Sequence, residues 1–128
     1  MEEWQLEFEW LRVRDFVREK LSRTTLPDLN IILLLIGIQE LGKPVTGKFT
    51  KEEKRDLMHI GCCRLLSEEG YYEYEGQDHD GWPHYKALRP FTLSGASEQE
   101  TYLKKLIIHY FNKLPISFKT LKLSTFEF

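Results

Sequence analysis

The feature that most restricts the fold is an apolar run in the first third of the chain. Residues 29–38 contain only Asn30 and Gly37 besides large aliphatic side chains. The longest apolar run, residues 31–38, is about eight residues long, whereas a membrane-spanning helix needs roughly 20. A helix that is apolar almost all round has to be covered by other elements. The sequence therefore predicts a central, buried helix over residues 28–41.

Two amphipathic segments are suited to cover this helix. Residues 7–21 have apolar side chains at three-and-four spacing, although residues 4–10 also alternate like a strand, so the first residues fit either structure. Near the other end of the chain, Ser97 and Glu100 have the spacing of a capping box, and Pro115 ends the helix that they begin. The apolar stripe of this last helix consists of Tyr102, Leu103, Leu106, Ile107, Tyr110, Phe111 and Leu114.

The most distinctive stretch is a capped helix that runs directly into a hairpin. Thr50 and Glu53 have the spacing of a capping box, and Gly70 stands where a left-handed residue would end the helix. The aromatic residues that follow suit a half-buried strand, and the glycines and acidic residues of segment 76–81 allow the chain to reverse. We therefore predict a third helix followed by a β-hairpin over residues 71–88.

The last residues, 116–128, have apolar side chains in pairs two apart, as in an extended strand. Such a tail could pair with the hairpin or with a second copy of the chain. The chain has 128 residues, enough for one core and too few for two domains. We predict a single α+β domain, mainly α-helical. Residues 1–115 form about four helices with a β-hairpin after the third, in a winged-helix-like order, and residues 116–128 form an extended tail that can add a C-terminal strand.

Charge and cysteine content bear on the surroundings of the protein. A net charge of −2 and a pI near 6.1 give no general attraction to the phosphates of nucleic acids or membranes. The two cysteines, Cys62 and Cys63, are neighbours, so a disulfide between them would be strained. The first ten residues are acidic and aromatic, unlike a secretory signal. We expect a cytoplasmic protein that binds no membrane and for which nucleic acid is disfavoured as a partner.

Histidine and cysteine residues raise the question of a metal site. His59 precedes Cys62 and Cys63 by three and four residues, so donors on one helix could meet one ion, and His79 or His84 of the hairpin could complete the site. The pattern lacks the paired Cys-x-x-Cys or His-x-x-x-His units of recognisable zinc sites. Cysteines in an apolar helix usually pack in the core. We predict no metal and no cofactor, with these five residues as the candidates if a metal is bound.

The same helix contains a pairing that resembles a thiol catalyst. A thiolate of Cys62 or Cys63 would be stabilised near His59, but no Asn or Asp is placed by the sequence to orient the imidazole. The acidic turn at residues 78–81 begins like a calcium loop and lacks the later oxygen ligands of one. We therefore predict no catalytic residue and no calcium site.

The hairpin is the best candidate for a contact surface. Trp82 precedes Pro83 and is therefore held extended, which can present the indole to a partner or fold it onto the helix beneath. The hairpin also has more aromatic surface than so short an element can bury. The predicted partner-binding residues are Tyr72, Tyr74, Trp82, Pro83, His84 and Tyr85.

Two other functions remain as alternatives. A winged-helix-like nucleic-acid binder inserts its third helix into the major groove and uses its hairpin as a wing. That function needs a basic face on the helix, although the acidic hairpin would repel phosphates. The basic residues are Lys51, Lys54, Arg55 and Arg64. The second alternative is a metal protein or enzyme in which four side chains converge. These are His59, Cys62, Cys63 and His84.

Three strings resemble a known family: LLIGIQELGK at residues 34–43, FTKEEKRDLMHIGCCRLLSEEGYYE at residues 49–73 and DGWPHYK at residues 80–86. Through them the chain resembles a family of small bacterial proteins of unknown function. The resemblance implies a common core of the third helix and the hairpin, and it implies no activity. Together with the surface argument, it leads us to predict a non-enzymatic protein-interaction or small regulatory module. Its partner would be an unknown protein or a second copy, bound through the hairpin or the tail.

Overall fold

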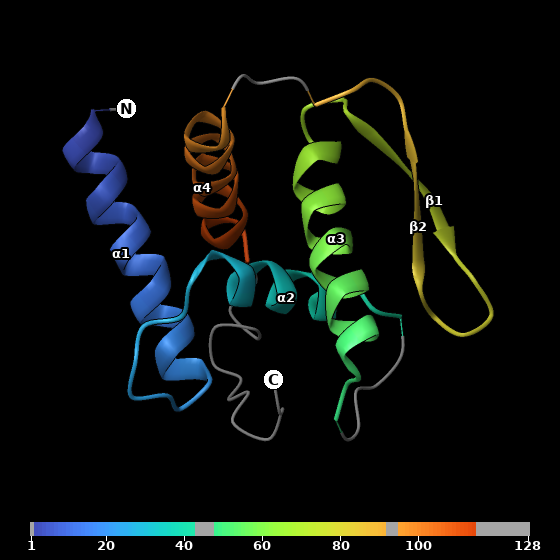
Figure 1. Ribbon diagram of the computed structural model, residues 1–128, viewed down its shortest axis with the longest axis horizontal. Helices are drawn as coiled ribbons and strands as arrows, with labels where there is room; N and C mark the ends of the chain where they lie inside the picture. Colours follow the sequence, from blue (N-terminus) through green and yellow to red (C-terminus); the bar gives the residue numbers. More distant parts are fainter. Residues whose placement is uncertain (1, 43–47, 92–94, 115–128) are drawn as a thin grey trace.

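The computed structural model describes residues 2–42, 48–91 and 95–114. These residues form four helices and a two-stranded antiparallel hairpin that follows the third helix (Figure 1). The elements are α1 (Glu3–Lys20), α2 (Leu29–Gln39), α3 (Lys51–Ser67), β1 (Tyr72–Gln77), β2 (Pro83–Ala87) and α4 (Ala96–Asn112). The fold is α+β and mainly helical, as predicted. The predicted extended tail at 116–128 lies outside the described residues.

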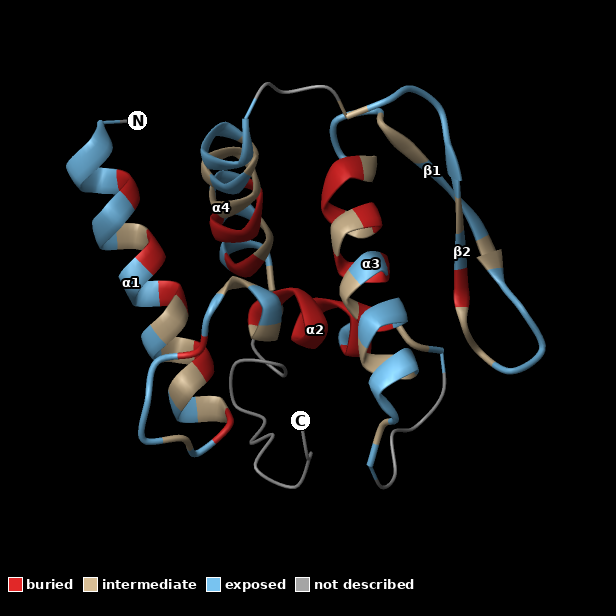
Figure 2. Ribbon diagram, viewed as in Figure 1, coloured by how far each residue is buried: buried red, intermediate tan, exposed pale blue. Residues whose placement is uncertain are grey.

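Three of the helices and the hairpin stand in a row, and α2 runs across two of these helices. Figure 1 shows α1, α4, α3 and the hairpin in that order, with α2 running across beneath α4 and α3. Every residue of the segment 32–38 in α2 is buried (Figure 2). The apolar run is therefore the central helix that the sequence predicts. In the described part of the chain, no helix combines the length and the apolarity needed to cross a membrane.

The backbones of α2 and α3 pack tightly because two glycines lie at their crossing. A Cβ atom added to Gly37 of α2 would overlap the carbonyl oxygen of Leu57, and one added to Gly61 of α3 would overlap that of Leu33. Only glycine permits so close an approach of two backbones. The pair fixes where the third helix sits on the central one.

α1 begins at Glu3, four residues before the predicted start. The strand-like alternation of residues 4–10 belongs to this helix, because Leu6 and Trp10 are buried while Trp4 and Phe8 are exposed. The side-chain oxygen of Gln5 accepts the backbone N–H of the N-cap residue at 3.2 Å and helps to begin the helix there. Apolar residues on two faces of one helix produced the ambiguous pattern.

The predicted cap of α3 is confirmed. Thr50 Oγ1 accepts the N–H of Glu53 at 3.1 Å, and the carboxylate of Glu53 accepts the N–H of Thr50 at 2.8 Å. Gly70 follows the helix with a positive φ of 80°, as the prediction of a left-handed terminator requires.

The predicted cap of α4 is wrong. The helix begins at Ala96, and Gly95 is its N-cap without a side-chain hydrogen bond. Ser97 therefore lies inside the first turn, where it cannot form the capping box with Glu100 that its spacing suggested.

Candidate functional site

The hairpin has an aromatic face and a charged face. Tyr74 pairs with Tyr85 across the strands, and their ring centroids are 5.4 Å apart. The preceding pair, Glu73 with Lys86, points to the opposite side because successive side chains of a strand alternate. Tyr85 packs against apolar residues of α2 and α3, so the aromatic face is the one directed toward the helices.

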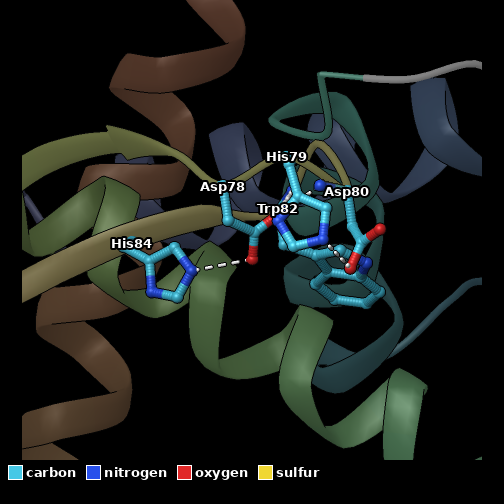
Figure 3. Close-up of polar contacts among 5 residues, drawn as sticks. All are labelled: Asp78, His79, Asp80, Trp82 and His84. Atoms are coloured by element: carbon cyan, nitrogen blue, oxygen red, sulfur yellow. Dashed lines mark hydrogen bonds and ion pairs between the residues drawn. The ribbon is translucent and has the colours of Figure 1, made fainter.

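Asp78 shapes the loop between the strands (Figure 3). Its Oδ1 accepts the backbone N–H groups of Asp80 and Trp82 at 2.9 and 3.1 Å, and its Oδ2 lies 2.9 Å from His84 Nε2. The hydrogen bond with His84, followed by that from the N–H of Trp82, holds the pKa of Asp78 below its ordinary value. His79 Nε2 lies 3.6 Å from Asp80 Oδ2, and both side chains are exposed. Asp78 and His84 thus hold the turn through their side chains.

The Trp82–Pro83 step attaches the hairpin to the helices. Pro83 is buried, and the half-buried indole of Trp82 packs on an apolar cluster at the α2–α3 crossing. That cluster consists of Leu34, Ile38, Leu57 and Ile60. Beside it, the N–H of Gly42 donates to the carbonyl oxygen of Gly81 at 2.9 Å. The indole thus lies against the helices, which is one of the two arrangements that the sequence allowed.

A groove of about 460 Å³ lies between the aromatic face of the hairpin and the helices. The hairpin contributes Tyr74, Gln77 and Tyr85 to the lining of this groove. The end of α2 and the two residues after it contribute Gln39, Glu40 and Leu41, and α3 contributes Arg64 and Ser67. Tyr74 is 52% exposed although it is on the face directed toward the helices. Burial raises the pKa of Tyr85 to about 12, so its hydroxyl group remains neutral and can donate a hydrogen bond.

Arg64 is the centre of an ion-pair cluster in this groove. Its guanidinium lies 2.8 Å from Glu40 Oε1 and 2.7 Å from Glu68 Oε1, and 5.5 Å from the centre of the Tyr110 ring. Burial raises the pKa of Glu40 above its ordinary value, and the charge and hydrogen bond of Arg64 offset part of that rise. The hydrogen bond from Arg64 lowers the pKa of Glu68.

A second cavity, of about 250 Å³, shares Gln39, Glu40 and Arg64 with the groove and extends to α4. Its lining there includes Tyr110, whose pKa burial raises. The sequence patterns do not predict Glu40 or Tyr110 as site residues. For Glu40 the sequence contains one signal. This glutamate directly follows an apolar helix, and a carboxylate that is half-buried there needs a cationic partner.

Arg64 is not part of a basic face on α3. Lys51 and Arg55 are one turn apart and exposed, with Glu52 and Asp56 beside them. Arg64 follows Arg55 by nine residues and therefore lies on the opposite side of the helix. The basic surface that nucleic-acid binding would require thus lacks one of its four predicted members.

His59 and Cys63 meet on α3, with His59 Nε2 3.5 Å from Cys63 Sγ. His84 is hydrogen-bonded to Asp78 instead. Within residues 2–42, 48–91 and 95–114, no three or more His, Cys, Asp or Glu side chains are placed to hold a metal ion together. Burial, and then the neighbouring Cys62, raise the pKa of Cys63 to about 11, and burial also raises the pKa of Cys62. Both shifts disfavour the thiolate that a nucleophile or a metal ligand requires.

These shifts predict an unreactive thiol. At pH 7, Cys63 of the native protein should react with iodoacetamide at least about 100-fold more slowly than in urea, because a pKa of about 11 leaves little thiolate. Mass spectrometry of the alkylated peptide measures both rates and separates Cys63 from Cys62. A native rate equal to the unfolded rate would instead indicate an activated cysteine.

No protein-family model, no curated protein and no solved structure matches this chain. The resemblance to a bacterial family therefore stays a prediction.

Proposed function

We propose that the chain is a non-enzymatic, cytoplasmic protein-interaction or small regulatory module whose groove binds an extended segment of another protein. The observation that carries the proposal is the position of Tyr74. This residue is on the inner face of the hairpin, yet about half of its side chain is exposed at the groove. An aromatic ring in this position becomes buried when a partner covers it, and such rings contribute much of the binding free energy at interfaces.

The hairpin edges support an extended segment as the occupant. In the described part of the chain the sheet has two strands, so β1 and β2 each have one edge without a neighbouring strand. Such edges offer backbone N–H and C=O groups to an added strand. The polar groups of the groove could then bind side chains of that segment, which supplies the specificity in this mode of recognition.

The attachment of the hairpin to the helices also supports the proposal. Trp82 and Pro83 fix one end of the hairpin on the α2–α3 crossing. At the other end, the Arg89 side chain lies 4.0 Å from the centre of the Tyr71 ring and donates a hydrogen bond to the carbonyl oxygen of Glu69 at 2.8 Å. A surface that is already ordered loses less conformational entropy when it binds.

Photo-crosslinking at Tyr74 tests this function. With p-benzoylphenylalanine in place of Tyr74, irradiation of cells of the source organism should join the chain to one discrete partner protein. The matched control has the same amino acid in place of Leu88, which is 51% exposed and does not line the groove. With the purified partner, Tyr74→Ala should weaken binding about tenfold, because the ring is expected to act as an anchor.

Three results of the crosslinking experiment would each contradict the proposed function. Equal yields from positions 74 and 88 would mean that the groove is not selective. A product of twice the chain mass alone would mean that the groove binds a second copy. Both results would contradict the proposal, as would an absence of any product at position 74.

A further inference from the structure

β1 presents two kinds of surface along one strand. Glu73, Tyr74 and Glu75 are consecutive in the sequence, and all three are exposed. Tyr74 is on the aromatic face beside the groove, and Glu73 is on the charged face of the hairpin because side chains alternate along a strand. A segment that lies beside β1 therefore meets an aromatic ring on one face and a carboxylate on the other.

The backbone of β1 is suited to pair with a further strand at this point. The N–H of Leu88 donates to the carbonyl oxygen of Tyr71 at 2.9 Å, next to the first residue pair of the hairpin. Every second residue of an antiparallel strand bonds to its partner strand, so the backbone groups of Glu73 face β2 and those of its two neighbours face the other edge. A bulge with Glu75 as its extra residue ends this regular stretch. A short segment can thus pair with residues 72–74.

The charges of the hairpin indicate what kind of segment this is. Segment 72–87 has four carboxylates and one lysine, which give it a net charge of −3, whereas the whole chain has a net charge of only −2. Among the described residues, Glu73 and Glu75 form no ion pair, although Lys86 is opposite Glu73 in the register. Such a hairpin attracts a basic segment and repels an acidic one.

We infer that the extended segment is a basic β-strand that pairs with the edge of β1, which rests on the proposed function and specifies the chemistry of its partner. Lysine or arginine residues alternate in this strand with apolar residues. An apolar, β-branched residue lies opposite Tyr74, because aromatic and β-branched side chains pair favourably across strands. The flanking cations are on the other face, one opposite Glu73 and one near Glu75, where opposite charges stabilise the pairing.

Three labelled peptides test this chemistry with the full chain. Lysine and valine alternate over about seven residues in the first, and glutamate and valine alternate in the second. Fluorescence anisotropy should give the basic peptide a Kd of about 100 μM or tighter, and the acidic peptide should bind at least about tenfold more weakly because it places like charges opposite each other. The third peptide has the composition of the first with all lysines before the valines. It cannot separate the two kinds of side chain onto opposite faces, so it should bind as weakly as the acidic peptide.

Variants of the chain assign the contact to β1. Glu73→Gln/Glu75→Gln should weaken the binding of the basic peptide about tenfold, because both carboxylates beside its cations are lost. Glu7→Gln/Glu19→Gln is the matched control, since it removes the same charge from exposed positions of α1, at the other end of the row of elements (Figure 1). Equal effects of the two double variants would mean that the peptide responds to the net charge of the chain, and would overturn the inference.

Methylation of the peptide backbone tests the strand pairing. Only every second amide of an added strand faces β1. A basic peptide methylated on its lysine amides and one methylated on its valine amides should therefore differ at least about tenfold in affinity, because one set of methyl groups blocks the hydrogen bonds to β1. The same affinity for both isomers would show that no strand is added and would overturn the inference.

The crosslinking experiment at Tyr74 separates this inference from the proposed function. A partner protein joined at Tyr74, together with an acidic peptide that binds as well as the basic one, would overturn the basic strand and leave the groove as a protein-binding site. Absence of both the crosslinked product and peptide binding would contradict the function and the strand alike.

Discussion

Gly37→Ala is expected to destabilise the protein by about 3 kcal/mol or more, because the added methyl group would overlap the backbone of α3 at Leu57. The sign of this effect is informative. In a helix without such a contact, alanine is more favourable than glycine by about 1 kcal/mol, so the same substitution would stabilise the fold. Urea unfolding followed by circular dichroism measures the difference.

A matched substitution on the same helix separates the clash from a general sensitivity of α2. Asn30 is exposed near the start of the helix. Asn30→Ala should therefore be neutral or stabilise the protein by about 0.5 kcal/mol through helix propensity. A Gly37→Ala protein that is as stable as the native chain would show that the backbones of α2 and α3 do not meet at this glycine.

The crossing illustrates what the sequence could and could not predict. The apolar run predicted that α2 is buried, and the spacing of Thr50 and Glu53 predicted where α3 begins, because both are local patterns. Gly37 and Gly61 are far apart in the sequence, and no periodicity indicates that they face each other. Their contact is a property of tertiary packing, so in the sequence Gly37 is only an interruption of the apolar run.

The ion-pair cluster was missed for the same reason. Glu40 and Arg64 each lie three residues beyond a glycine of the crossing, so the contact of the glycines brings their side chains together. The spacing from Arg55 places Arg64 on the other side of α3, but without the crossing it does not show which residue of α2 Arg64 meets there. The aromatic hairpin residues were found from composition and turn chemistry, whereas the groove beside Tyr74 depends on how far the helices extend beneath the hairpin.

Arg64→Met is expected to destabilise the protein by about 2 kcal/mol at pH 7, because it leaves the Glu40 carboxylate half-buried without its cation. Loss of one partner of a fully buried pair costs more, about 3 to 5 kcal/mol. Here the side chains of Arg64 and Glu40 are 29% and 25% exposed, so water screens part of the charge. The control is Arg12→Met, which breaks an exposed pair with Glu9 and should change stability by less than about 0.5 kcal/mol.

The cost of Arg64→Met should depend on pH. In the variant, burial keeps the pKa of Glu40 above the unfolded value of 4.5, and no cation offsets the rise. The native state then binds more protons than the unfolded state above pH 4.5, so the stability of the variant falls as the pH rises through this window. Glu68 acts in the same direction, because its pKa is lowered by Arg64 in the native chain and that stabilising contribution is lost as the pH falls. The difference between the native chain and the variant should therefore be smaller at pH 4.5 than at pH 7.5.

A double-mutant cycle assigns the effect to the pair. Glu40→Gln removes the charge that is costly to bury, so Arg64→Met should cost about 1 kcal/mol less when glutamine is at position 40. The pH dependence of the remaining cost should shrink too, because glutamine does not titrate. Equal costs of Arg64→Met in both backgrounds, measured by urea unfolding at pH 7.5 and 4.5, would mean that Arg64 stabilises the fold through Glu68 or the Tyr110 ring instead. A lower cost of Arg64→Met when glutamine is at position 40 would show that Arg64 stabilises the fold by compensating the half-buried charge of Glu40. The groove could then keep both polar side chains beside the α2–α3 crossing without a loss of stability.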